Sequence, residues 1–94
     1  MSINIIQVTA NASTPTFIGT IPNGPSSVVI TNANNAGVLI GTSTNLTQTN
    51  GFEIPPNQRV EFQTYGTSRG ANMYALVATG GSTGPVSMLV SSTD

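Results

Sequence analysis

Residues 59–63 read Arg59-Val60-Glu61-Phe62-Gln63, and this strict alternation of polar and apolar residues decides the fold class. Successive side chains of a β-strand point to opposite faces of its sheet, so Val60 and Phe62 share one face and the other three share the opposite one. The stretch therefore predicts a strand with one buried face and one face in water. Arg59 and Glu61 are expected to pair on the wet face, where an ion pair contributes only about 0–1 kcal/mol.

Short hydrophobic runs recur along the rest of the chain at intervals of roughly ten residues, separated by Gly, Pro and Asn, as in sandwiches and barrels. No stretch shows the helical period of an amphipathic helix. The expected strands are seven in number, at Ile3–Val8, Thr14–Thr20, Ser27–Asn32, Gly37–Thr42, Gln58–Thr64, Met73–Thr79 and Val86–Ser91.

The length of 94 residues suits one domain and is too short for two. We therefore expect a single all-β domain over residues 1–94, a small antiparallel β-sandwich or barrel of about seven strands. Jelly-roll and immunoglobulin-like topologies both accommodate that number of short strands.

Turn residues separate the expected strands. Asn23-Gly24-Pro25 and Asn50-Gly51 are expected to supply positive-φ positions, and Pro55-Pro56-Asn57 to form an extended turn. Two segments, Thr42–Asn50 and Gly80–Pro85, have the polar or Gly-rich composition of loops.

Three of the expected strands carry apolar residues on both faces: Ile3–Val8, Val38–Ile40 and Met73–Ala78. Such strands indicate a closed barrel, a covering loop or a subunit interface, because one face of an antiparallel sheet normally meets water. For Met73–Ala78 a buried central strand is the simplest interpretation. A terminal strand is free to add to the edge of another chain, so residues 1–13 are interpreted as a contact arm or strand. The candidate capsid or subunit contacts are Ile3, Ile5, Ile6 and Val8.

Charged residues are very scarce. The ionised side chains are Glu53, Arg59, Glu61, Arg69 and Asp94, and the chain has no lysine or histidine. Ordinary soluble domains carry about a quarter charged residues, and a net charge near zero favours association. The composition therefore indicates a protein that assembles with others, and we expect a homo-oligomer.

The same scarcity bears on function. Two arginines do not form the basic stripe that binds nucleic acid or an anionic membrane surface, and no apolar run approaches the ~20 residues of a membrane span. Without histidine, lysine or cysteine, nucleophilic catalysis and zinc binding lack their usual groups. We expect no enzyme activity, no cofactor or metal and no small-molecule substrate. A glycosidase that uses Glu53 and Glu61 is a remote alternative, because two carboxylates suffice for that chemistry.

Two further features bear on binding and location. Tyr65 and Tyr74, with Phe52, are candidates for a sugar-stacking platform beside the polar loop at residues 43–50.

The N-terminus lacks the basic flank and the apolar core of a secretory signal, so synthesis in a cytoplasm is expected.

About two-thirds of the chain resembles a class of small bacteriophage virion proteins. The shared pattern is a valine-rich strand ending in Asn, an aliphatic strand ending in Ile-Gly, a Gly-Phe turn, a proline turn, a further strand and a Tyr-Ala strand. In this sequence the elements are Val28–Asn32, Val38–Thr42, Asn50–Pro56, Arg59–Thr64, Met73–Leu76 and Val86–Val90.

The resemblance implies a compact β-sandwich or barrel that decorates or cements a phage capsid, or forms the base of a head fibre. Its partner would be the major capsid protein, and its location the capsid surface of the virion after synthesis in the host cytoplasm. The alternative is a receptor- or glycan-binding module associated with a tail or fibre.

Overall fold

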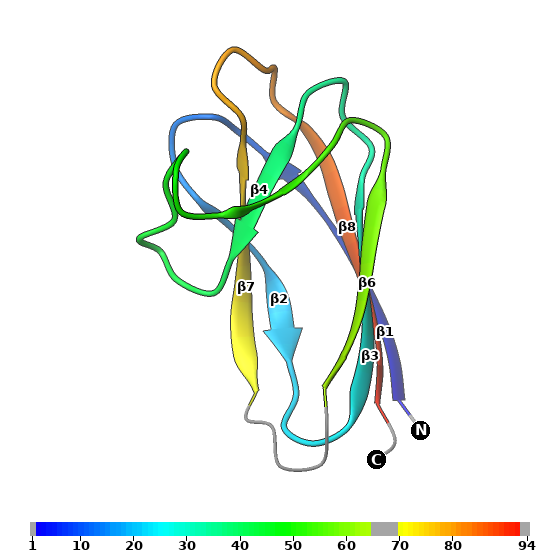
Figure 1. The fold of residues 1–94 in the computed structure, drawn as a ribbon. Coiled ribbons are helices and arrows are strands. Elements are labelled where there is room, and N and C mark those ends of the chain that lie inside the picture. The colour runs from blue at the N-terminus through cyan, green and yellow to red at the C-terminus, as the bar shows by residue number, and fades with distance from the viewer. Residues whose placement is uncertain (1, 65–69, 93–94) are drawn as a thin grey trace.

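The computed structural model describes residues 2–64 and 70–92 (Figure 1). Over these residues it is all-β, which confirms the expected fold class. The strands are β1 (Ser2–Ala10), β2 (Thr16–Ile21), β3 (Ser26–Asn32), β4 (Val38–Gly41), β5 (Phe52–Ile54), β6 (Arg59–Thr64), β7 (Ala71–Val77) and β8 (Gly84–Ser92).

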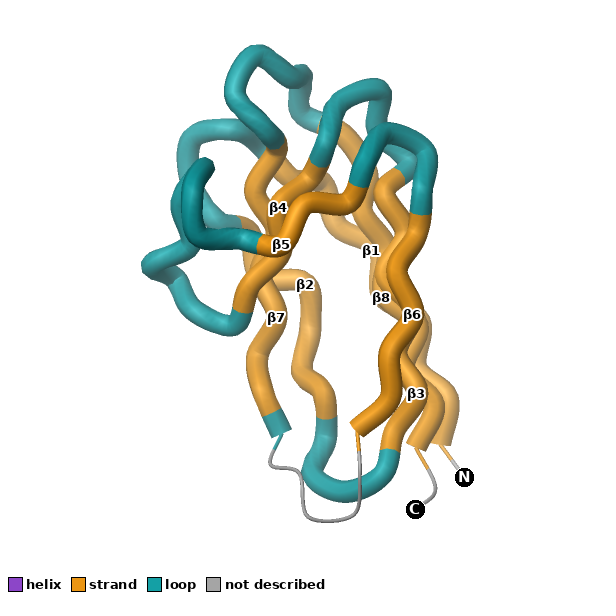
Figure 2. Tube along the Cα trace, in the orientation of Figure 1, coloured by secondary structure: helices purple, strands orange, loops and turns teal. Residues whose placement is uncertain are grey.

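Each strand in the first half of the chain pairs with the strand that is equally far from the other end. β1 pairs with β8, β2 with β7, β3 with β6 and β4 with β5, all antiparallel. Pairing of β3 with β8 and of β4 with β7 completes two four-stranded sheets: sheet A, with the order β1-β8-β3-β6, and sheet B, with the order β2-β7-β4-β5. Figure 2 shows the two sheets as facing layers. This order is that of a jelly roll, so the immunoglobulin-like alternative is wrong.

All seven expected strands are present, with ends that differ by a few residues, and the structure adds β5 as an eighth. β5 has only three residues and lies between a polar loop and Pro55. Three residues are too few to show the alternation of polar and apolar residues by which a strand is recognised in a sequence. It becomes a strand because Phe52 and Ile54 pair with β4.

The core lies between the inner faces of the two sheets. Val60 and Phe62 pack against it from β6 while Arg59, Glu61 and Gln63 are exposed, as the alternation predicts. Most core residues are aliphatic, which suits the flat space between two sheets about 10 Å apart. The buried members are Ala10, Ile18, Ile21, Val28, Ile30, Val38, Ile40, Ile54, Met73, Ala75, Val77, Val86, Met88 and Val90.

A covering loop explains why β4 and β7 are apolar on both faces. Leu39 and Leu76 lie on the outer face of sheet B, where Leu46 from the loop between β4 and β5 packs on them to form a second small core. The Gln48 side chain holds the loop in place: its amide nitrogen donates to the Val77 carbonyl (2.9 Å), and its amide oxygen accepts from the Thr79 N–H (2.9 Å). The composition of residues 42–50 predicts only a polar loop, but in the structure this loop packs on sheet B.

Asn32 ties the end of β3 to sheet B. Its side chain is fully buried, and its amide nitrogen donates to the carbonyls of Ala36 (2.8 Å), Ile54 (3.0 Å) and Pro55 (3.1 Å). Its amide oxygen accepts from the Asn34 N–H at 2.9 Å. One buried side chain thus bonds backbone groups of the β3–β4 loop, of β5 and of the proline turn, and its own polar atoms have partners, as buried polar groups require.

The turns differ in part from expectation. Gly24 has φ of +91°, as predicted, and Asn57 adopts φ of +58° in the proline turn. The expected positive φ at Asn50-Gly51 is wrong. Gly51 is instead required for space, because a Cβ there would lie 2.6 Å from Leu46 Cδ1 and 2.9 Å from Leu39 Cβ.

Candidate interaction surfaces

The outer face of sheet A is a nearly neutral surface with an apolar centre. Strand register aligns its side chains in rows that run across all four strands. The middle row carries Ile5, the half-buried Leu89 and Val29, and Glu61 at the far edge. The rows are Ile3-Ser91-Ser27-Gln63, Ile5-Leu89-Val29-Glu61 and Gln7-Ser87-Thr31-Arg59.

The structure divides the four candidate contact residues between the two faces of β1. Ile3 and Ile5 point outward, with 63% and 69% of their side chains exposed. Ile6 and Val8 are half-buried and pack against the core. Residues 2–10 are strand β1 of sheet A, and of the four apolar candidates Ile3 and Ile5 are the two available to an outside partner.

Among the described residues, the charges of this face lie at its β6 edge. Arg59 Nε lies 4.0 Å from Glu61 Oε1, and both side chains are about two-thirds exposed, so the expected pair forms but is weak. Toward β1, the face presents hydroxyl, amide and aliphatic groups. Such a surface can be buried without leaving an uncompensated charge.

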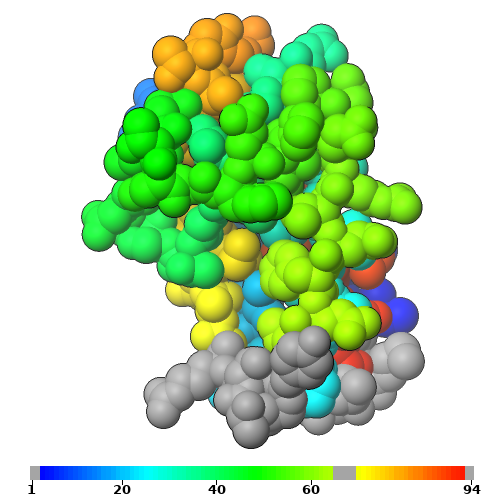
Figure 3. Space-filling model, viewed as in Figure 1, coloured from blue at the N-terminus to red at the C-terminus, as the bar shows by residue number. Residues whose placement is uncertain are grey.

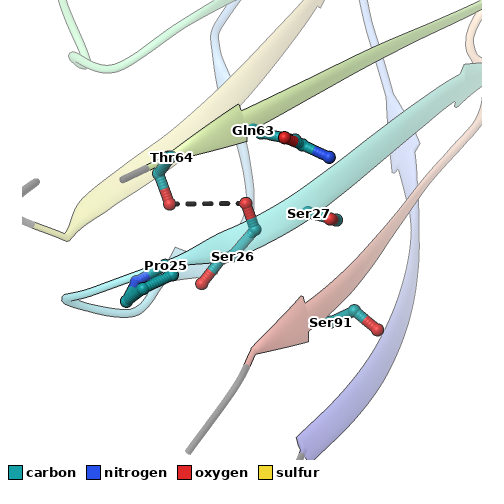
Figure 4. A pocket seen from close by; sticks show the side chains of 6 residues that line it. All are labelled: Pro25, Ser26, Ser27, Gln63, Thr64 and Ser91. Carbon is teal, nitrogen blue, oxygen red and sulfur yellow. Dashed lines mark hydrogen bonds between the residues drawn. The ribbon is translucent and has the colours of Figure 1, made fainter. Parts of the chain in front are cut away.

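A shallow depression lies at one end of the same face (Figure 4). Its lining includes Ser27, Gln63 and Ser91, which form one row, and Pro25. Thr64 Oγ1 donates to the Gly24 carbonyl at 3.0 Å and, more weakly, to the Ser26 carbonyl at 3.5 Å. The lining residues are neutral, so the depression offers hydrogen bonds but no group that titrates near neutral pH.

An apolar depression opens where the sandwich is not closed. At one margin β1 lies against β2, whereas at the other a hollow is lined by residues of β5, β6 and the neighbouring strands of sheet B. Phe52 shares the face of its inward-pointing pairing partner Ile40, yet 60% of its side chain is exposed. Figure 3 shows this side of the molecule. The lining residues are Ile40, Phe52, Val60, Phe62 and Met73.

The two carboxylates of the glycosidase alternative do not share a site. Glu53 pairs in register with Leu39 and so lies on the outer face of sheet B. Glu61 pairs with Val29 on the outer face of sheet A. Opposite outer faces are separated by both sheets, which already lie about 10 Å apart, whereas glycosidase carboxylates are about 5–9.5 Å apart.

The two described members of the candidate aromatic platform do not lie on one face. Tyr74 lies on the outer face of sheet B and Phe52 on the inner face of the same sheet, while Tyr65 is outside the described residues. Tyr74 instead packs edge to face with Phe17, with ring centroids 5.7 Å apart. Sequence reasoning placed Phe17 in a strand and gave it no role, because its pairing with Tyr74 depends on strand order.

Comparison with known proteins bears on the fold. No family model matches the chain, and no curated protein matches it significantly. A solved structure of IMPa from Pseudomonas aeruginosa in complex with an O-glycopeptide is similar, with a TM-score of 0.58 and 19% identity over 96% of this chain. A structure of Bacillus endospore appendages, described as a novel family of disulfide-linked pili, has a TM-score of 0.59 and 18% identity over 95% of this chain.

These likenesses establish the fold alone. The chain corresponds to 12% of the IMPa chain, so it resembles one part of a much larger protein, and to 82% of the pilus protein. Among the described residues there is no helix long and apolar enough to cross a membrane.

Proposed function

We propose that this chain is a non-enzymatic structural protein of a bacteriophage particle, a decoration protein that binds the major capsid protein at the virion surface. The outer face of sheet A is the proposed contact. The observation that carries the proposal is the exposure of Ile3 and Ile5, two large aliphatic side chains beside each other on one face of a regular strand.

Burying Ile3 and Ile5 supplies the driving force, because transfer of apolar surface from water contributes about 25 cal/mol per Å². The hydroxyl and amide groups around them can hydrogen-bond to a partner without the desolvation cost of a charge. Four strands ~4.8 Å apart and about seven residues long present a projected area of roughly 400 Å². That is about half of the ~800 Å² that a stable interface buries on each partner, so we expect weak attachment of a single copy and stronger attachment where copies are joined in an oligomer.

One of the compared structures supports a role in assembly. It comes from Bacillus endospore appendages, described as a novel family of disulfide-linked pili, and this chain aligns with 82% of it. A jelly roll with few charged residues suits a protein that acts by binding other proteins. The step from assembly subunit to phage capsid rests on the sequence resemblance.

The test is cosedimentation of the purified protein with empty phage shells, quantified against the major capsid protein. Saturable binding at a simple ratio to capsid subunits is the expected result. The Ile3→Ser/Ile5→Ser variant should lose most of its binding while unfolding at nearly the same denaturant concentration. Phe17→Ser, which removes an exposed apolar side chain from the opposite sheet, is the matched control and should bind normally.

Absence of saturable binding would contradict the capsid proposal and favour the second candidate, a glycan-binding module of a tail or fibre. The Phe17–Tyr74 pair favours that candidate, because it places aromatic surface on the outer face of sheet B. One neighbour, moreover, was solved with an O-glycopeptide. A glycan array would then show hits that Phe17→Ala abolishes; an array without hits excludes the module for the glycans it displays.

A further inference from the structure

β6 is an edge strand with a free side. It pairs with β3, and its other edge has no partner strand among residues 2–64 and 70–92. The Asn32 N–H donates to the Gln58 carbonyl at 2.9 Å, so Gln58 directs its backbone groups toward β3. Because this direction alternates along a strand, Arg59, Glu61 and Gln63 direct theirs away from the sheet. The free edge therefore offers a regular set of donors and acceptors.

β6 carries only part of the usual protection of an edge. Proteins guard such edges with proline, charged side chains (lysine above all), bulges or inward-pointing charges, and β6 has two outward-pointing charges of opposite sign, Arg59 and Glu61. β6 has no proline, lysine or inward charge, and its pairing with β3 is free of register shifts. Its inward side chains, Val60 and Phe62, are half-buried and line the apolar depression that also exposes Phe52.

We propose that β6 pairs antiparallel with β6 of a second copy, about a two-fold axis that passes beside Val60. The charges of β6 select both the partner and the register. With Val60 opposite itself, Arg59 lies opposite Glu61 of the partner copy and Glu61 opposite the partner's Arg59. Opposite charges directly across an antiparallel pair are stabilising. This inference does not depend on what the outer face of sheet A binds.

Other registers that keep the two faces matched are less favourable. Centring the pair on Glu61 places two glutamates directly opposite each other, which is destabilising. Centring it on Phe62 pairs Glu61 with the neutral Gln63 and carries Arg59 beyond the described end of the partner strand. Only the Val60 register pairs both charges with their opposites.

The Val60 register also fits the backbone. Arg59 and Glu61 direct their N–H and C=O groups to the free edge, so the two charged pairs become hydrogen-bonded pairs that exchange four backbone bonds. Val60 then meets its copy in a non-hydrogen-bonded pair, where side chains approach more closely. The two A sheets become one eight-stranded sheet with a shared outer face, since a two-fold axis perpendicular to the sheet keeps the outer faces together.

Sedimentation equilibrium of the full chain, from micromolar to about 1 mM, tests the inference. A concentration-dependent dimer is expected. Arg59→Glu and Glu61→Arg should each raise the dissociation constant by roughly tenfold to a hundredfold, since each creates two like-charged pairs. The double swap R59E/E61R should restore it to within about threefold. A monomer at every concentration, or single variants that dimerise normally, would overturn the proposal.

Proline variants test the register. The N–H groups of Glu61 and Gln63 are both directed to the free edge, so proline at either position leaves the β3 pairing intact. Glu61→Pro should abolish the dimer, because it removes bonds at the axis. Gln63→Pro, the matched control, should dimerise normally, because Gln63 lies outside the paired segment in the Val60 register. Loss of the dimer with Gln63→Pro would overturn this register, and thermal unfolding would confirm that both monomers fold.

Discussion

At the scale of single residues, Asn32 is the most consequential side chain. In a fully buried position, its amide nitrogen lies within hydrogen-bond distance of three carbonyls and its amide oxygen accepts from one N–H. Asn32→Ala should lower the free energy of unfolding by about 2–4 kcal/mol, because buried polar groups lose their partners. Urea unfolding measures the change. A loss below about 1 kcal/mol would show that water replaces the amide.

Asn32→Asp adds a pH test at the same position. In the Asn32→Asp variant one carboxylate oxygen would keep the Asn34 N–H, but the oxygen that replaces the amide nitrogen would face the Ala36, Ile54 and Pro55 carbonyls. Burial and these carbonyls disfavour the charged form, so the pKa of the carboxyl in the folded state should lie above the ordinary Asp value of ~3.9. A group whose folded pKa is raised stabilises below its unfolded pKa and loses that contribution as pH rises. The variant should therefore be more stable near pH 3 than near pH 7, relative to wild type, in urea titrations at both values. Equal differences at both pH values would contradict this account.

At the scale of elements, side chains along β1 alternate between the core and the outer face of sheet A. Residues that pack on the core are thereby separated from residues exposed to a partner. Ile6→Ala should destabilise by about 1–2 kcal/mol because its side chain packs on the core, and Ile5→Ala by less than about 0.5 kcal/mol because its side chain is mostly exposed. The two variants are matched in chemistry and adjacent in sequence. Chemical denaturation of both is the measurement, and a reversed order would mean that β1 is shifted by one residue.

The loop between β4 and β5 is a second element with a testable attachment. Leu46→Ala should cost about 2 kcal/mol of stability, at the low end for buried leucine because the second core is small. Gln48→Ala should speed amide hydrogen exchange at Thr79, whose N–H donates to the Gln48 side chain. The exposed Thr44→Ala is the control and should change neither. Unchanged exchange at Thr79 would show that another group protects this amide.

At the scale of the whole molecule, the jelly roll joins the two ends of the chain. β1 and β8 pair along their full lengths, and the described N- and C-terminal ends lie side by side (Figure 1). Contacts between the first and last strands form only after long loops close, which slows folding. Stopped-flow refolding should therefore take milliseconds to seconds. Refolding in microseconds would contradict the dependence on these long-range pairs.

Removal of residues 1–10 should abolish cooperative unfolding, because it exposes the β8 edge and the core that Ile6, Val8 and Ala10 cover. Near-UV circular dichroism and thermal unfolding of the truncated chain provide the measurement. A truncated chain that unfolds cooperatively would mean that this segment is a dispensable arm.

The sequence by itself determined the all-β class, the seven longer strands and the inward and outward faces of β6, because these follow from alternation and turn residues close together in the chain. It also singled out Ile3 and Ile5 among the candidate contacts, but not their separation from Ile6 and Val8, which depends on which face of β1 meets the core. Tertiary structure alone decided the jelly-roll order, the short β5, the Asn32 clamp, the covering role of Leu46 and the Phe17–Tyr74 pair. Each of these depends on at least one contact between residues far apart in sequence, so no local pattern encodes it.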